Sequence, residues 1–138
     1  MPSLVRFGVS LEKDLLQRFD VHIKQKKYAT RSEAIRDLIR ESLIKQEWKE
    51  GKEIAGAVTL IYDHHKRELV NKILDVQHDF SGLIISLQHV HIDHDNCLEL
   101  LAVKGAPQKV QKLSDSLKSI KGVKHSALSM STTGRDIV

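Results

Sequence analysis

Residues 4–11 alternate between apolar and polar side chains, which is the pattern of a half-buried strand. The polar positions share one face of that strand, and they are Arg6, Gly8 and Ser10. Apolar residues at helical spacing then predict a helix over residues 12–26. The pattern therefore predicts a strand that is followed directly by a helix.

A second helix is predicted where Thr30 and Glu33 have the spacing of a capping box, in which each side chain satisfies a backbone amide of the other. This helix runs to about Trp48. One strand and two helices in so short a segment cannot bury enough apolar surface to fold alone, and the strand would expose both of its edges. We therefore expect an obligate dimer, in which two copies of the strand pair antiparallel across a twofold axis.

The second half of the chain alternates between strands and helices. The predicted strands are residues 54–62, 83–92, 97–103 and 123–130, and the predicted helices are residues 66–77 and 107–120. The order βαββαβ is that of the ferredoxin-like fold, an antiparallel sheet with both helices on one face. The expected fold class is therefore α+β, a βαα unit followed by a ferredoxin-like domain.

A polar segment that contains glycine separates the two halves. We predict a first domain over residues 1–49, a linker over residues 50–52 and a second domain over residues 53–138. Residues 131–138 are polar, and we expect them to be loose.

Composition narrows the class of protein. No apolar run in the 138 residues approaches the ~18 residues that a membrane helix needs. The first residues lack the apolar core of a signal peptide, so we expect a cytoplasmic protein with no membrane association. The single cysteine cannot form an internal disulfide, which agrees with a reducing compartment. The net charge of +4 permits nucleic-acid binding without indicating it.

Histidine and cysteine gather in the second half. His89 and His91 point to the same face of their predicted strand. Residues 93–96 have the composition of a tight turn, which would bring Cys97 back beside this pair on a neighbouring strand. With His78 on the preceding helix, three imidazoles and one thiolate form a donor set for a late first-row divalent cation, zinc included. Alternatively, the two strand histidines are polar residues on a solvated face of the sheet.

The outward face of the paired N-terminal strands would fit the major groove of DNA. There Arg6 can donate two hydrogen bonds to guanine, and Ser10 can bond several base edges. The start of the second helix and a nearby basic run favour phosphate. The candidates for phosphate contact are Lys27, Thr30, Arg31 and Ser32. The alternative is a plain dimerisation module with a solvated charge run.

Two stretches of the sequence resemble a known family. Residues 31–37 (Arg-Ser-Glu-Ala-Ile-Arg-Asp), which follow the alternating strand, look like the ribbon-helix-helix DNA-binding domain. Residues 89–99 (His-Val-His-Ile-Asp-His-Asp-Asn-Cys-Leu-Glu), set in the βαββαβ order, resemble the nickel-responsive transcriptional regulator family, NikR. The resemblance covers nearly the whole chain.

This resemblance implies a homotetramer, a dimer of dimers, that is joined through an ACT-like core and binds double-stranded operator DNA. It also implies one Ni(2+) per subunit, held square-planar by His89, His91 and Cys97 together with His78 supplied by a neighbouring subunit. The family's activity is nickel-dependent repression of nickel uptake genes. The sequence departs from the family at Gly8, where members carry a polar side chain, so the bases read at that position stay open.

Several residues are candidates for supporting roles. Glu99 shares a strand face with Cys97 and could orient a ligand imidazole, or it could be an ordinary exposed glutamate. Tyr62 and His64 are candidates for a weaker site or a gate, although His64, like His65 and His94, is expected to be a surface residue. A second, hard cation is suggested by the family at Glu33 and Asp37, which could equally be a solvated acidic pair.

No catalytic constellation is present in the sequence, so we expect neither an enzyme nor a protein substrate. The leading hypothesis is a metal-sensing repressor. Its rivals are a ribbon-helix-helix protein of the antitoxin type, an amino-acid-sensing regulator without a nickel role, and a metal store. An amino-acid sensor leaves the His/Cys set unexplained, and a metal store gives the N-terminal strand no role.

Overall fold

The computed structural model describes residues 3–138, and its first two helices begin where the sequence predicts. Helix α1 spans Lys13–Gln25 and helix α2 spans Arg31–Glu50. The capping box is present, since the Glu33 amide donates to Thr30 Oγ1 at 3.1 Å and the Glu33 carboxylate accepts from the Ala29 amide at 3.3 Å. The return contact is thus made one residue earlier than the motif predicts.

Helix α1 ends in a left-handed turn. Lys27 has a φ of 62°, and the Tyr28 amide donates to the Ile23 carbonyl at 3.1 Å. This contact is the long hydrogen bond of a Schellman-type cap, which usually places glycine at the left-handed position. A lysine there carries a steric cost that glycine would avoid.

The predicted strand over residues 4–11 is not formed in the single chain, where this segment has no ladder of hydrogen bonds. Its apolar side chains are largely exposed, with Val5 at 84% and Phe7 at 70% of their full accessibility. The predicted buried stripe of α2 is likewise exposed, for example at Leu38 and Leu43. A strand needs a neighbour to pair with, and the pairing of two copies that the sequence predicts stays a prediction.

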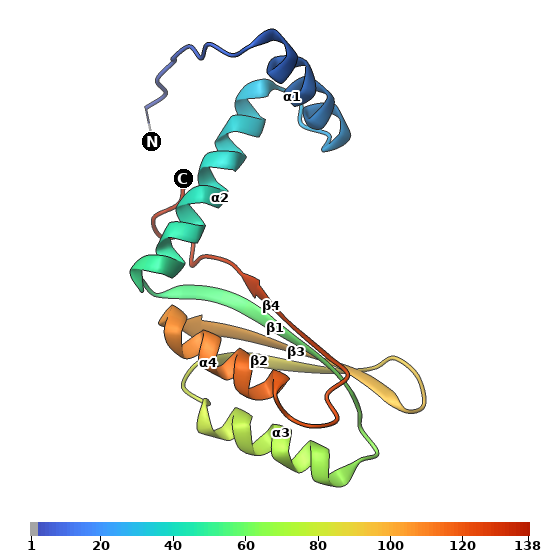
Figure 1. Ribbon diagram of the computed structural model, residues 1–138. Coiled ribbons are helices and arrows are strands. Elements are labelled where there is room, and N and C mark those ends of the chain that lie inside the picture. Colours follow the sequence, from blue (N-terminus) through green and yellow to red (C-terminus); the bar gives the residue numbers. More distant parts are fainter. Residues whose placement is uncertain (1–2) are drawn as a thin grey trace. The chain divides into compact units, whose positions relative to one another are not determined.

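The second half folds as the sequence predicts. The strands are β1 (Ile54–Asp63), β2 (Ile84–His91), β3 (Asn96–Gly105) and β4 (His125–Met130), and the helices are α3 (Arg67–Asp79) and α4 (Pro107–Lys118). The strands form one antiparallel sheet in the order β2-β3-β1-β4, and both helices cover the same face of it (Figure 1). The βαββαβ prediction is confirmed, with boundaries that differ by a few residues.

The hydrophobic core lies between this sheet and its two helices. Val58 and Leu101 come from the central strands, Ile73 from α3 and Leu113 from α4, and none is more than 1% exposed. Burying one such side chain contributes about 1.5–3 kcal/mol, so this layer supplies most of the stability of the domain. No helix among residues 3–138 combines the length and the apolar character that crossing a membrane requires.

The contacts of the chain divide it into two compact units, with the division between Ile39 and Arg40 inside α2. The domain boundary that the sequence suggests lies further along, at residues 50–52, and remains a prediction. The expectation of a loose tail is wrong for the chain as folded. Within the second unit, Trp48 Nε1 donates to the Ser131 carbonyl at 2.8 Å, and Thr132 Oγ1 donates to Glu47 at 2.8 Å.

Candidate metal centre and nucleic-acid interface

Strand pairing brings three of the predicted ligands to one end of the sheet. The turn over residues 93–96 is formed, because Asp93 accepts hydrogen bonds from the Asp95 and Asn96 amides at 3.0 and 2.8 Å. As a result His91 lies directly opposite Cys97 in the β2–β3 ladder. His89 lies opposite Glu99 in the same ladder. Opposite residues in an antiparallel pair share a face, so both imidazoles and the thiol are on the helix-covered side.

Cys97 is fully buried at this end of the sheet. Its Sγ donates to the carbonyl of Tyr62 at 3.4 Å, across the β1–β3 pairing. Burial raises the pKa of the Cys97 thiol above its usual value. The thiol is therefore protonated near neutral pH, and a metal that binds there must displace this proton.

Glu99 is buried beside the histidines rather than exposed, with only 2% of its surface accessible. The Tyr62 hydroxyl donates to one carboxylate oxygen, and the Gln77 side chain donates to the other at 2.9 Å. His89 Nδ1 lies 4.0 Å from the same carboxylate. Burial, followed by the hydrogen bond to Glu99, raises the pKa of Tyr62, which keeps this hydroxyl a donor. The Glu99 carboxylate is thus close enough to the His89 ring to influence its orientation.

The imidazoles at this end form a continuous series of ring contacts. The rings of His89 and His91 are 5.2 Å apart, and His64 stacks on His91 with 4.5 Å between centroids and 5° between planes. His64 also contacts His65 at 4.2 Å, and His65 contacts His94 at 4.9 Å. His65 and His94 are exposed, as expected of surface residues, and they also contact one another and His64 through their rings.

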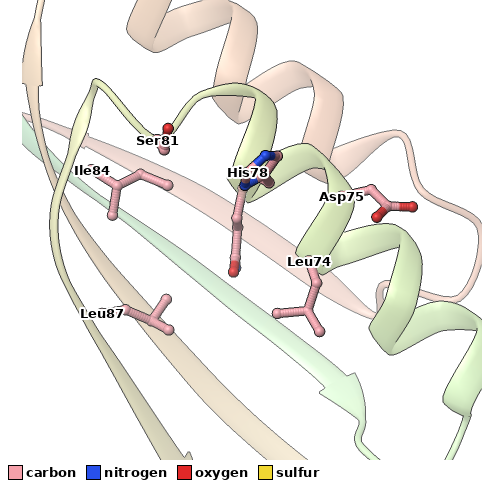
Figure 2. A pocket seen from close by; sticks show the side chains of 7 residues that line it. Leu74, Asp75, His78, Ser81, Ile84 and Leu87 are labelled. Carbon is pink, nitrogen blue, oxygen red and sulfur yellow. The ribbon is translucent and has the colours of Figure 1, made fainter.

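His78 lies apart from the other predicted ligands. It is exposed on α3, in an open groove that it shares with Leu74, Ile84 and Leu87 (Figure 2). Within residues 3–138, the group of side chains close enough to hold one ion is a different one, His65, His94 and Asp95. The strand register thus puts His89, His91 and Cys97 at the same end of the sheet, and His78 lines a separate groove on α3.

The N-terminal candidates lie in the first unit. Arg6, Gly8 and Ser10 are exposed in the extended segment, and a side chain at Gly8 would meet nothing within 4 Å. The Arg31 guanidinium is held by the Asp20 carboxylate through two hydrogen bonds of 2.9 Å. The hydrogen bond from Arg31 lowers the pKa of Asp20.

The remaining residues at the start of α2 have structural roles. Thr30 caps the helix, and the carbonyl of Ser32 accepts from Arg36 Nε at 3.4 Å. The two acidic candidates for a second cation have separate partners, since Glu33 accepts from the Ala29 amide and Asp37 accepts from the Tyr28 hydroxyl at 2.7 Å. A cation at Glu33 and Asp37 therefore remains a prediction.

Two residues of these sites escaped the sequence analysis. Gln77 is buried and holds Glu99, and Asp20 holds Arg31. The only signal for Gln77 was its position next to His78, four residues after Ile73 and three after Leu74 on an amphipathic helix. Nothing in the sequence distinguished Asp20 from Asp14, the other acidic residue of α1.

Comparison with known proteins defines the class of this one. The ribbon-helix-helix family typified by copG matches residues 5–46, and the NikR C-terminal nickel-binding domain matches residues 55–131. Relatives from Syntrophus aciditrophicus and Chlorobium limicola, both named as nickel-responsive regulators, are 60% and 58% identical over 98% and 97% of this chain. These matches span 98% and 100% of the relatives' own lengths.

The chain is a DNA-binding regulator that joins a ribbon-helix-helix segment to a metal-binding domain. It belongs to the nickel-responsive regulator family, NikR. This is a family of regulators and not of enzymes, as the sequence analysis expected.

A solved structure shares the fold of the second domain. An uncharacterized protein of Thermotoga maritima, TM1266, aligns with a TM-score of 0.51 at 17% identity over 56% of this chain and 95% of its own. The ACT domain of a GTP pyrophosphokinase from Chlorobium tepidum aligns with a TM-score of 0.48 at 17% identity, over 56% of this chain and 99% of its own.

Proposed function

We propose that this regulator senses Ni(II) through His89, His91, Cys97 and His78, with one ion per subunit, and represses nickel uptake genes when the metal is bound. The observation that carries this proposal is the pairing of His91 with Cys97 across β2 and β3, with His89 two residues away on the same face. Two imidazoles and a buried thiol at one end of a sheet suit a late first-row cation.

Glu99 supports the choice of this site. Within residues 3–138 the buried Glu99 carboxylate has two neutral donors and no lysine or arginine partner, which is costly unless a positive charge comes near it. A divalent cation that is bound to one thiolate retains one positive charge, which the Glu99 carboxylate balances through His89. We therefore assign Glu99 the role of orienting His89 and balancing the charge of the loaded site.

The position of His78 supports a site that is shared between subunits. Leu74 and Leu87 flank it in an open groove and are 52% and 48% exposed, which is unusual for neighbouring apolar side chains of a stable monomer. A second copy that covers the groove would bury them and bring His78 to the His89, His91 and Cys97 of that copy. When bound, nickel would supply bonds that join two subunits through this contact.

The N-terminal segment supports a second interface. Val5, Phe7 and Val9 are each more than half exposed and share one strand face, so pairing with the same segment of another chain would cover them. Arg6 and Ser10 then point outward on a two-stranded ribbon. The assembly that follows is a homotetramer with two DNA-reading ribbons, which acts on operator DNA in the cytoplasm.

A metal-dependent gel shift with DNA from upstream of the protein's own gene tests this function. We expect binding in the presence of Ni(II), loss of binding with a chelator, and loss of specific binding in Arg6→Ala with nickel affinity unchanged. Specific DNA binding that ignores nickel would favour the antitoxin-type reading. A response to an amino acid instead of nickel would favour the amino-acid sensor.

A further inference from the structure

We propose that residues 131–138 act as a clasp, which holds the last turns of α2 against the metal-binding domain and makes them a rigid part of it. By their contacts, residues 40–138 form one compact unit, and this unit includes the second half of α2. The clasp is the segment that follows β4, and it is polar in sequence. Its role is to couple α2 to the domain that carries the predicted nickel ligands.

The clasp bonds two neighbouring residues near the end of α2. Trp48 Nε1 donates to the Ser131 carbonyl, and Thr132 Oγ1 donates to the Glu47 carboxylate, each at 2.8 Å. Glu47 is only 6% exposed, whereas glutamates are rarely buried so deeply. A carboxylate that has lost most of its hydration depends on the hydrogen bonds that replace it, so losing the Thr132 hydroxyl is costly.

Both ends of the clasp are attached. The Ser131 amide donates to the Ala55 carbonyl at 3.1 Å, so Ser131 bonds β1 through its amide and α2 through its carbonyl. At the other end, Arg40 Nε donates to the Val138 carbonyl at 2.7 Å. Arg40 and Trp48 lie about two turns apart on α2, so the clasp bonds the helix at separate points along its length.

The turn between α2 and β1 also has a defined geometry. The Lys52 amide donates to the Glu47 carbonyl at 3.3 Å, and Gly51 has a left-handed φ of 77°, which together make a Schellman-type cap. A Cβ at Gly51 would lie 3.2 Å from the Gln108 side chain in the first turn of α4. These contacts favour a fixed connection at residues 50–52, in addition to the clasp.

Trp48 seats the end of α2 on the sheet. Its ring packs against the hydrophobic core of the domain. A Cβ at Gly56 on β1 would lie 3.6 Å from this ring and 2.7 Å from the Ser129 carbonyl. The close approach of these groups therefore requires a residue without a side chain at position 56.

The regulatory consequence of the clasp rests on the proposed nickel-dependent binding of DNA. Nickel can change DNA affinity only if a change in the metal-binding domain alters the DNA-binding segment. Helix α2 is the part of the chain that leads from one to the other, since it runs from Arg31 to Glu50. When the last turns of α2 are loose, local motion there absorbs part of the change, and nickel should then raise DNA affinity less.

Hydrogen exchange of the full-length, metal-free protein, followed by mass spectrometry, tests the clasp. Thr132→Val removes the hydroxyl that bonds Glu47, so amides of residues 40–50 should exchange about tenfold faster. Trp48→Phe keeps an aromatic ring but removes its N–H donor, and it should accelerate the same amides. The amides of β1 and β3 should keep their protection in both variants.

Thr133→Val is the matched control. The Thr132 hydroxyl accepts from the Gly134 amide at 3.1 Å, and the Thr133 hydroxyl accepts from the Arg135 amide at 3.4 Å, so each variant loses a similar local contact. Of the two threonines, Thr132 is the one that bonds α2. Equal exchange in wild type, Thr132→Val and Trp48→Phe would overturn the clasp, and so would equal acceleration in Thr132→Val and Thr133→Val.

The regulatory consequence is tested with labelled DNA from upstream of the gene, by fluorescence anisotropy with and without Ni(II). Thr132→Val should reduce at least threefold the factor by which nickel raises DNA affinity, while calorimetry shows unchanged nickel affinity. Faster exchange with an unchanged nickel effect would overturn the regulatory consequence. Wild-type protein whose DNA binding ignores nickel would contradict the proposed function, and the exchange experiment would still decide whether the clasp exists.

Discussion

His91 and Cys97 face each other across the β2–β3 ladder, because only a tight turn separates them in sequence. The turn reverses the chain, and the register then fixes which residues are opposite. Because directly opposite side chains lie about 4.5–5.5 Å apart at Cβ, one ion can take a ligand from each with little movement of the backbone. The same register puts Glu99 opposite His89, so the strand pairing that brings the proposed ligands together also places a carboxylate beside one of them.

Replacing Cys97 by alanine should abolish the sulfur-to-metal charge-transfer band of the nickel-loaded protein and weaken nickel binding at least tenfold. The reason is that the sequence holds a single cysteine, so no other thiolate can take its place. Absorption and calorimetric titration measure the two effects. Circular dichroism should show that the variant keeps its fold, because the substitution removes only a small side chain. Equal nickel affinity in variant and wild type would contradict the assignment of Cys97 as a ligand.

Mixed assemblies should show whether His78 reaches the site from another subunit. His78→Ala and Cys97→Ala chains should each fail to form the wild-type site alone. After the two are unfolded and refolded together, some sites should combine His78 from one chain with Cys97 from the other, and part of the thiolate band should return. The absorption of the mixture at equal nickel measures this.

A chain that carries both substitutions is the control for this mixing experiment, because it cannot contribute an intact site when refolded with either single variant. If the ligands all came from one chain, mixing the single variants would restore nothing. That result would place His78 within its own subunit's site or remove it from the ligand set.

Gln77→Leu should lower the free energy of unfolding by about 1–3 kcal/mol, since it removes a hydrogen bond to the buried Glu99 carboxylate and leaves that oxygen without a donor. Urea unfolding of the metal-free protein measures the change. Gln88→Leu makes the same substitution at an exposed strand position and should change stability by less than about 0.5 kcal/mol. Equal effects of the two would mean that the contact to Glu99 contributes nothing.

The sequence predicted the features that depend on residues close to one another along the chain. The order of elements, the capping box at Thr30 and the turn before Cys97 are encoded by spacing within a few residues, and each is confirmed. The strand alternation of His89 and His91 belongs to the same class. These predictions need no knowledge of what packs against the segment.

The features that depend on contacts between distant parts of the sequence, or with another chain, were not predictable in the same way. The strand over residues 4–11 requires a neighbouring edge that the single chain does not offer, and its pairing with a second copy stays a prediction. The pairs Gln77–Glu99 and Asp20–Arg31 join different elements, so they depend on how helices and strands are placed. The expected loose tail was wrong for this reason, since its partners on α2 lie far away in sequence.

Lys27→Gly should stabilise the first unit by about 1 kcal/mol, because Lys27 has a left-handed backbone that glycine adopts without steric cost. Thermal unfolding of the full-length protein, with helicity as the signal, measures the gain. Lys27→Ala removes the same charge but not the strain, so it should give no gain. If the two variants are equally stable, the left-handed turn is not a source of strain. Both variants remove the same charge, so a loss of DNA affinity that they share reports the predicted phosphate contact of Lys27.

The contact between Asp20 and Arg31 should be visible in the titration of the carboxyl group. The hydrogen bond from Arg31 lowers the pKa of Asp20, so the pair contributes stability above the ordinary carboxyl pKa and loses it as the pH falls through the lowered value. In Arg31→Gln the Asp20 pKa should return towards its ordinary value, as followed by NMR of the side-chain carboxyl carbon. Arg36→Gln, which alters an arginine that bonds a carbonyl instead, should leave it unchanged.

The same pair should compete with DNA for the Arg31 guanidinium. A phosphate and a carboxylate make the same kind of two-pronged contact, so Arg31 must leave Asp20 before it can bind the DNA backbone. Asp20→Asn should therefore tighten binding to nonspecific DNA roughly two- to fivefold, in line with the small value of an exposed ion pair. Fluorescence anisotropy at fixed salt measures this gain, with Asp14→Asn as the control that changes the net charge of α1 equally. If both variants tighten binding to the same degree, the gain comes from net charge and Asp20 does not restrain Arg31.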